Sequence, residues 1–244
     1  MIESILLSAA RVLTFIGSQR LTNASGFYFE RDGRLFLVTS RHVLIDTPSE
    51  HFPDRIEIEV HTDSANMTQS MGFSVPLYSG DTPVWKQGTD MAGDIDVAVI
   101  ELDRTALPEP MAYTAFNPSH LSYEPGQIEV GDAVLVVGFP LGFHDSLHHL
   151  PVARHAVIAS SFSLRFEGQG YFLTDGRTHR GTSGAPVVIR RRDAQPELGP
   201  LTWMLLGVHS ARIDIDTRDL VLDEALGLNC AWFADILLTL TASS

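Results

Sequence analysis

The stretch "HRGTSGAPVV", residues 179–188, places one serine in a glycine-rich turn that runs directly into an apolar, β-branched strand. Gly181 and Gly184 permit the backbone angles of a tight turn, which glycine adopts without steric cost. Such a turn can direct the N–H groups of Gly181 and Ser183 at one point, where they would stabilise a developing oxyanion. The same letters also fit an ordinary hairpin turn. Ser183 is therefore a candidate nucleophile only if a general base and a buried acid occur elsewhere in the chain.

Two segments in the first half of the chain offer these partners. His42 follows the apolar run 34–40, and a strand end can hold an imidazole rigidly toward a cleft, as a general base requires. Asp96 opens another apolar run, where a carboxylate can be shielded from water and still accept a histidine N–H. Asp94 is the alternative acid, but it lies further from the apolar residues, so we favour Asp96. A lone histidine is a weak signal, whereas base, acid and nucleophile in this order predict a Ser-His-Asp triad between two halves of the chain.

Short apolar runs along the whole chain predict an all-β fold. In residues 55–61, apolar and polar side chains alternate with a period of two, which is typical of a strand with one buried face. Other runs bounded by turn signals predict strands buried on both faces; they are residues 34–40, 96–102, 133–140, 185–190 and 203–210. One stripe with a 3.6-residue period predicts a C-terminal helix packed on the core; its members are Trp232, Phe233, Ile236, Leu237 and Leu240.

Composition narrows the classes of function. The 244 residues carry a formal net charge of −13, and an acidic surface repels phosphate backbones, so we expect no nucleic-acid partner. We find no basic amphipathic segment and no apolar run long enough to span a bilayer, so we expect no membrane partner. Cys230 is the only cysteine, so an intrachain disulfide is impossible; together with the lack of a basic, uninterrupted signal peptide this favours a cytoplasmic location.

Taken together, these segments resemble the chymotrypsin-fold serine peptidases, in particular the bacterial trypsin-like and HtrA-type peptidase domains. The segments that carry the resemblance are "SGFYFERDGRLFLVTSRHVL", "DVAVIEL", "VGDAVLVVGFPLG", "LTDGRTHRGTSGAPVV" and "LLGVHSA". The resemblance implies two six-stranded antiparallel β-barrels followed by the C-terminal helix. We expect residues 1–118 to form the barrel that carries His42 and Asp96, and residues 119–244 to form the barrel that carries Ser183. We expect no PDZ-like second domain.

The resemblance also implies a role for each site residue. His42 would be the base, Asp96 the orienting acid and Ser183 the nucleophile, with the N–H groups of Gly181 and Ser183 as the oxyanion hole. Ser210 matches a serine that in many relatives hydrogen-bonds the triad aspartate. The protein would then be a serine endopeptidase that acts on polypeptides through an acyl-enzyme and needs no cofactor.

Two residues depart from the family pattern near the nucleophile. Thr182 stands where secreted digestive relatives carry an aspartate that pairs with a newly cleaved N-terminus, so we expect no zymogen switch of that kind. Ala185 replaces the commoner second glycine, a small change that we expect the turn to tolerate.

Further residues bear on the choice of substrate. Thr178 and His209 resemble the threonine and histidine with which glutamyl endopeptidases and viral 3C-type proteases hold a Glu or Gln side chain. A hydroxyl and an imidazole N–H can donate to a carboxylate or amide oxygen in a partly dry pocket. Ser210 and Arg212 complete the candidate substrate-binding residues, and we predict a preference for Glu or Gln at P1. A histidine packed beneath the sheet and a solvated arginine are the alternative interpretation.

The histidine-rich segment 144–155 raises the question of a metal. His144 and His148 have the i, i+4 spacing that binds zinc on a helix, but the flanking Gly142 and Pro151 favour a polar surface loop. We therefore predict no metal site. Two alternatives to the peptidase stay open at this point: a peptide-binding module with little or no catalysis on the same fold, and a metal-dependent hydrolase that uses these histidines.

Overall fold

The predicted strands are present in the computed structural model, which describes residues 2–121, 123, 126–191, 201–210 and 227–243. The alternating segment becomes β4 (Arg55–His61), whose Ile56, Ile58 and Val60 are buried. This is the outcome that a period of two dictates for a strand with one solvated face.

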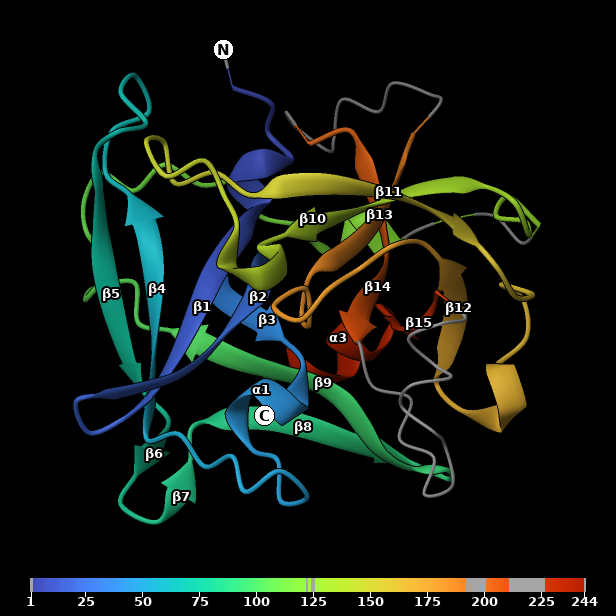
Figure 1. Ribbon diagram of the computed structural model, residues 1–244, viewed down its shortest axis with the longest axis horizontal. Helices are drawn as coiled ribbons and strands as arrows, with labels where there is room; N and C mark the ends of the chain where they lie inside the picture. The colour runs from blue at the N-terminus through green and yellow to red at the C-terminus, as the bar shows by residue number, and fades with distance from the viewer. Residues whose placement is uncertain (1, 122, 124–125, 192–200, 211–226, 244) are drawn as a thin grey trace.

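The first half of the chain forms an antiparallel seven-stranded sheet, coloured blue to green in Figure 1, in the order β5-β4-β1-β2-β3-β9-β8. Its other strands are β1 (Ala9–Ile16), β2 (Gln19–Arg31), β3 (Arg34–Thr39), β5 (Ser70–Pro76), β8 (Trp85–Asp90) and β9 (Gly93–Leu102), and a small hairpin of β6 (Tyr78–Ser79) and β7 (Thr82–Pro83) lies beside it. The sheet thus has one strand more than the six we expected. Segment 70–76 escaped prediction because its apolar Phe73 and Val75 are only partly buried, which makes the strand signal weak.

The second half forms the closed six-stranded barrel that the family resemblance implied. Its order is β10-β11-β12-β15-β14-β13. The strands are β10 (Ala133–Gly138), β11 (Val152–Ile158), β12 (Tyr171–Asp175), β13 (Pro186–Arg190), β14 (Trp203–Ser210) and β15 (Leu228–Phe233). Short 3-10 turns lie before β1 at η1 (Leu6–Ser8), between β9 and β10 at η2 (Pro118–Leu121), between β10 and β11 at η3 (Pro140–Gly142), and between β11 and β12 at η4 (Phe166–Gly168).

The C-terminal segment differs from the prediction in its first part. Trp232 and Phe233 lie in β15, and the helix α3 (Ile236–Leu240) is only five residues long. The strand forms because β15 pairs with both β12 and β14 and so closes the barrel. Hydrogen bonding on both edges therefore outweighs the helical periodicity of the sequence.

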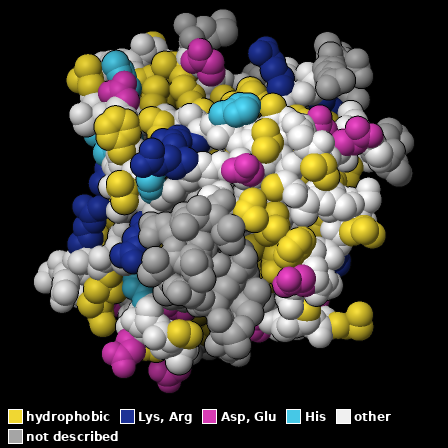
Figure 2. Space-filling view, turned by 45° about the vertical axis from the view of Figure 1, so that its right-hand side comes forward, with side chains coloured by type: hydrophobic (Ala, Val, Ile, Leu, Met, Phe, Trp, Pro, Cys, Tyr) yellow, Lys and Arg dark blue, Asp and Glu magenta, His cyan; other side chains and the backbone are white. Residues whose placement is uncertain are grey.

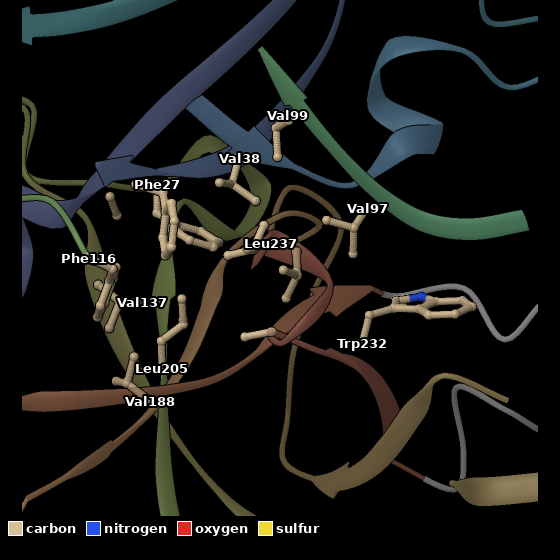
Figure 3. Packing of buried hydrophobic residues seen from close by; sticks show 14 of the residues in the cluster. Phe27, Val38, Val97, Val99, Phe116, Val137, Val188, Leu205, Trp232 and Leu237 are labelled. Carbon is tan, nitrogen blue, oxygen red and sulfur yellow. The ribbon is translucent and has the colours of Figure 1, made fainter. Parts of the chain in front are cut away.

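Helix α3 packs onto the first sheet and joins the two halves. The guanidinium of Arg31 donates to the carbonyl of Leu238 at 2.5 Å, and that of Arg34 donates to the carbonyl of Thr241 at 2.6 Å. Figure 3 shows Leu237 in the same hydrophobic cluster as Val38 of the first sheet and Leu205 of the barrel. One hydrophobic cluster thus spans both halves, and the division into residues 1–118 and 119–244 stays a prediction.

Two further observations concern the surface charge and the length of the helices. On the face in Figure 2, acidic side chains are dispersed over the surface rather than gathered in one patch. None of the helices in the described residues has the length and apolar character needed to cross a membrane.

Candidate active site

His42 is held on a short helix directly after a buried strand. β3 ends at Thr39, and α1 (Arg41–Leu44) begins two residues later. The backbone N–H of His42 donates to Asp96 Oδ1 at 2.8 Å, and its ring Nδ1 lies 2.7 Å from Asp96 Oδ2. This double contact makes Nδ1 the protonated nitrogen, so Nε2 is left to accept a proton.

Asp96 receives a third hydrogen bond from the second half of the chain. Ser210, the last residue of β14, donates its hydroxyl to Asp96 Oδ2 at 2.6 Å. Burial alone would raise the pKa of Asp96, but the charge of His42 and the hydrogen bonds from His42 and Ser210 outweigh it and lower the pKa. The carboxylate therefore stays ionised next to the imidazole, as the stabilisation of an imidazolium requires.

Asp94, the alternative acid, pairs with Arg41. Its Oδ2 lies 3.2 Å from Arg41 Nη2, and its side chain is 53% exposed. The structure thus brings together His42 and Asp96, and places Asp94 in an exposed ion pair.

Ser183 lies in the turn between β12 and β13, and its residue surface is only 7% exposed. Gly181 and Gly184 have φ angles of +92° and +85°, in the region that favours glycine. A Cβ on Gly184 would also collide with the carbonyl of Ser25 and with Thr39. Thr182 closes the turn from within, because its hydroxyl donates to the carbonyl of His179 at 2.7 Å.

One backbone carbonyl connects the segments that carry the base and the nucleophile. The carbonyl of His209 accepts a hydrogen bond from Ser40 Oγ at 3.2 Å and another from the N–H of Gly184 at 2.8 Å. Ser40 precedes α1, Gly184 follows Ser183, and the next residue of β14 is Ser210. Two adjacent residues, His209 and Ser210, thus contact Asp96 and the segments that carry His42 and Ser183.

The backbone around Gly181 leaves the predicted oxyanion hole open. The carbonyl of Arg180 accepts a hydrogen bond from the N–H of Leu141 at 2.6 Å. Because a trans peptide points its N–H away from its carbonyl, the N–H of Gly181 is directed away from Leu141. Neither it nor the N–H of Ser183 donates to any acceptor in the described part of the chain. Two free donors are what a developing oxyanion needs.

Ser25 supports this arrangement and was missed by the sequence analysis. Its hydroxyl, fully buried on β2, donates to the carbonyl of Gly181 at 2.7 Å and accepts from the N–H of Phe139 at 2.9 Å. Its backbone N–H donates to the carbonyl of Ser183 at 2.9 Å. No sequence signal marks a single serine in a strand as the contact between two halves of a protein.

We expect Ser25→Ala to destabilise the fold by about 3 kcal/mol, because the N–H of Phe139 and the carbonyl of Gly181 each lose a buried partner. We also expect kcat on a cleaved peptide to fall by about 10–100-fold with little change in KM, because the oxyanion-hole turn shifts. Chemical denaturation and steady-state kinetics measure the two effects.

Ser8→Ala is the matched control for this variant. Ser8 is also fully buried in the first half, and among the described residues its hydroxyl donates only to the carbonyl of Ile5, at 2.8 Å. The control should cost about 1 kcal/mol and leave kcat unchanged. Equal kcat values for the two variants would contradict a positioning role for Ser25.

The candidate specificity residues occupy different environments. His209 is fully buried, and neither ring nitrogen has a hydrogen-bond partner in the described residues. Burial, together with the charge of His42, lowers the pKa of His209 to about 4, so its ring is neutral at pH 7. The hydroxyl of Thr178 hydrogen-bonds the side chain of Asn229 on β15, a residue that the sequence analysis did not consider. Arg212 lies outside the described residues.

The histidine-rich segment is the part of the described chain that could hold a metal. His144 and His148, predicted from their spacing, do not face one another on a helix. His148 Nδ1 lies 2.7 Å from Asp145 Oδ2, whereas His144 joins Glu59 and His149 in a cluster of possible ligands. The prediction of no metal site is taken up again below.

Comparisons with known proteins agree with this architecture. The family model described as the trypsin-like peptidase domain matches residues 24–193. This chain belongs to the trypsin-like peptidase domain family. The match includes the segments that hold His42, Asp96 and Ser183.

Solved structures share the fold at low sequence identity. The serine endoprotease from Yersinia pestis has a TM-score of 0.53 and 16% identity over 97% of this chain. A protease of M. tuberculosis in its active form has a TM-score of 0.51 and 16% identity over 98% of this chain and 83% of its own. This chain spans only 62% of the Yersinia protein. No curated protein matches it in sequence.

Proposed function

We propose that this protein is a serine endopeptidase that cleaves polypeptides through an acyl-enzyme. Membership of the trypsin-like peptidase family supports the peptidase activity. The observation that carries the assignment of residues is the coordination of Asp96, which accepts two hydrogen bonds from His42 and one from Ser210. This arrangement fixes the tautomer that a general base requires.

The reaction follows from the roles of these groups. Ser183 Oγ attacks the scissile carbonyl carbon while His42 Nε2 takes the hydroxyl proton, and Asp96 stabilises the imidazolium that forms. The N–H groups of Gly181 and Ser183 bind the oxyanion. As the tetrahedral intermediate collapses, the C–N bond breaks and His42 returns the proton to the leaving amine. A water molecule, deprotonated by His42, then hydrolyses the ester and restores the Ser183 hydroxyl.

Within this function, we propose a preference for Glu or Gln at P1. His209 supports it, because a buried neutral imidazole without a hydrogen-bond partner in the described residues offers an N–H to a side-chain oxygen. Thr178 already has a hydrogen-bond partner in the protein. Its hydroxyl proton is already engaged with Asn229, so Thr178 would have to exchange partners to contact a substrate.

A peptide library with all residues at P1 tests this preference. We expect cleavage after Glu or Gln, and we expect His209→Val to lower kcat/KM for those peptides by about 10–100-fold, since a lost hydrogen bond leaves the substrate oxygen unpaired in a dry pocket. Peptides with Ala at P1 serve as the internal control and should change much less. Equal cleavage after all residues, or an unchanged profile in His209→Val, would contradict the preference.

We further propose that the enzyme works in a bacterial cytoplasm without nucleic-acid or membrane partners. Cys230, which is buried in β15, is the only cysteine of the sequence, so an intrachain disulfide is impossible, which suits a reducing compartment. The acidic charge of −13 supports the absence of a nucleic-acid partner.

A further inference from the structure

A cluster of possible metal ligands lies between the two halves of the molecule. Part of it belongs to a loop close to the predicted oxyanion hole. Glu59 projects from β4 of the first sheet, while His144 and His149 belong to the loop between η3 and β11 of the second half. One ligand atom from each of the three residues lies within 4.8 Å of the others. All three residues are partly buried.

Each of the two imidazoles has a ring nitrogen that could bind a metal ion. His144 Nδ1 lies 2.6 Å from the carbonyl of Gly142, to which it can only donate, so its Nε2 carries a lone pair. Ligand histidines are commonly fixed by such a bond from the other ring nitrogen. His149 Nδ1 lies 2.9 Å from Glu59 Oε1, but this contact lacks hydrogen-bond geometry, and the buried nitrogen has no hydrogen-bond partner in the described residues.

The loop that carries the histidines is held in place without a metal. Asp145 and Leu150 form a β-bridge, and the Asp145 carboxylate accepts hydrogen bonds from the N–H groups of Leu147 and His148. On β4, His61 Nε2 donates to the carbonyl of His148 at 2.7 Å. Because these bonds fix the loop to β4, little ordering cost would remain when an ion binds.

The guanidinium of Arg11 lies next to two members of the cluster, His144 and Glu59. Its Nη1 lies 3.1 Å from His144 Nε2 and 3.9 Å from Glu59 Oε2, whereas its Nε is buried without a hydrogen-bond partner in the described residues. An ion bound to His144 Nε2 would have to replace the Arg11 contact. The guanidinium would therefore compete with a metal ion for His144 Nε2 and lower the affinity of the cluster for that ion.

We propose that Glu59, His144 and His149 bind a divalent transition-metal ion, with Zn²⁺ as the probe that represents this class. Two imidazole nitrogens and one carboxylate oxygen are a ligand set that Zn²⁺ uses with a fourth position open to water. Imidazole favours this class over Mg²⁺ and Ca²⁺, which prefer oxygen ligands.

The bound ion would connect two parts of the molecule. It would tie β4 to the loop that follows η3, and η3 contains the Leu141 whose N–H donates to the Arg180 carbonyl. The site goes beyond the proposed peptidase function, and its existence does not depend on catalysis.

Isothermal titration of the 244-residue Ser183→Ala protein with Zn²⁺ tests the site without autolysis. We expect one ion per chain, and an increase of the unfolding temperature by about 5–10 °C at a hundred-fold excess over Kd. Glu59→Gln and His149→Gln in the same background should each weaken binding at least about 100-fold, because losing a ligand costs more than losing an outer-shell contact. Unfolding temperatures without Zn²⁺ show that each variant is folded.

Two further variants distinguish this site from other histidines. Arg11→Gln should bind Zn²⁺ at least about ten-fold more tightly, because a competing charge is removed. His148→Gln is the matched control from the same loop, and it should bind like the parent. No binding by the parent, an unchanged affinity in Arg11→Gln, or a loss in His148→Gln with retention in His149→Gln would overturn the proposal.

Discussion

Replacing Ser183 by alanine is expected to lower kcat for a cleaved peptide by about 10⁶-fold. Without the hydroxyl, the carbonyl of the substrate has no nucleophile, although the oxyanion hole and the binding residues remain. The side chain is small, and the turn is held by its backbone, through the Ser183 carbonyl and the N–H of Gly184. We therefore expect the unfolding temperature to change by less than about 2 °C.

Ser163→Ala is the matched control, since Ser163 is an exposed serine of the same half. It should leave kcat and stability unchanged. If Ser183→Ala retained more than about 1% of the parental kcat in a preparation free of other proteases, Ser183 would not be the nucleophile.

Replacing Asp96 by asparagine is expected to have the next largest effect, a loss of about 10⁴-fold in kcat. The carboxylate accepts from both the backbone N–H and the Nδ1–H of His42, and from Ser210. An amide has only one acceptor oxygen, so its NH₂ group would face one of these donors and favour the wrong imidazole tautomer. Steady-state kinetics at several pH values measure the loss.

Asp94→Asn is the matched control for this variant. Asp94 is two residues away and half exposed, and it pairs with Arg41. An exposed ion pair contributes little, so we expect less than a two-fold change in kcat. Equal losses for the two asparagine variants would contradict the assignment of Asp96 as the orienting acid.

The sequence allowed the strands to be predicted, and a triad to be proposed, because both leave local signals. β4 and β14 have the predicted ends at residues 55, 61, 203 and 210, since their hydrophobic patterns are bounded by turn residues. His42 and Asp96 could be chosen because each adjoins a buried strand.

Other features depend on contacts between distant segments, so no local pattern predicts them. Residues 228–233 have helical periodicity but form β15, because both edges of the strand find partners in the barrel. Ser25, Leu141 and Asn229 acquire their roles only when the two halves meet. The cluster of Glu59 and His149 is likewise formed by folding, whereas the i, i+4 spacing pointed to His148.

The alternative function, a peptide-binding module without catalysis, assigns no nucleophilic role to Ser183. In the described part of the chain, Ser183 Oγ makes no hydrogen bond with a protein group. Catalytic contacts often tighten only when substrate binds. A substrate-free peptidase is therefore compatible with this observation. A pure binding module would keep its peptide ligand in Ser183→Ala and would show no turnover in the parent.

The measurement that tests the central claim most directly is covalent labelling of the purified protein with a fluorophosphonate probe, beside Ser183→Ala and His42→Ala. The probe reacts only with a serine that has been activated by a base. We predict labelling of the parent at Ser183, located by peptide mass spectrometry, and none in either variant. An unlabelled parent, or labelling that persists in Ser183→Ala, would contradict the assignment of Ser183 and His42 as nucleophile and base.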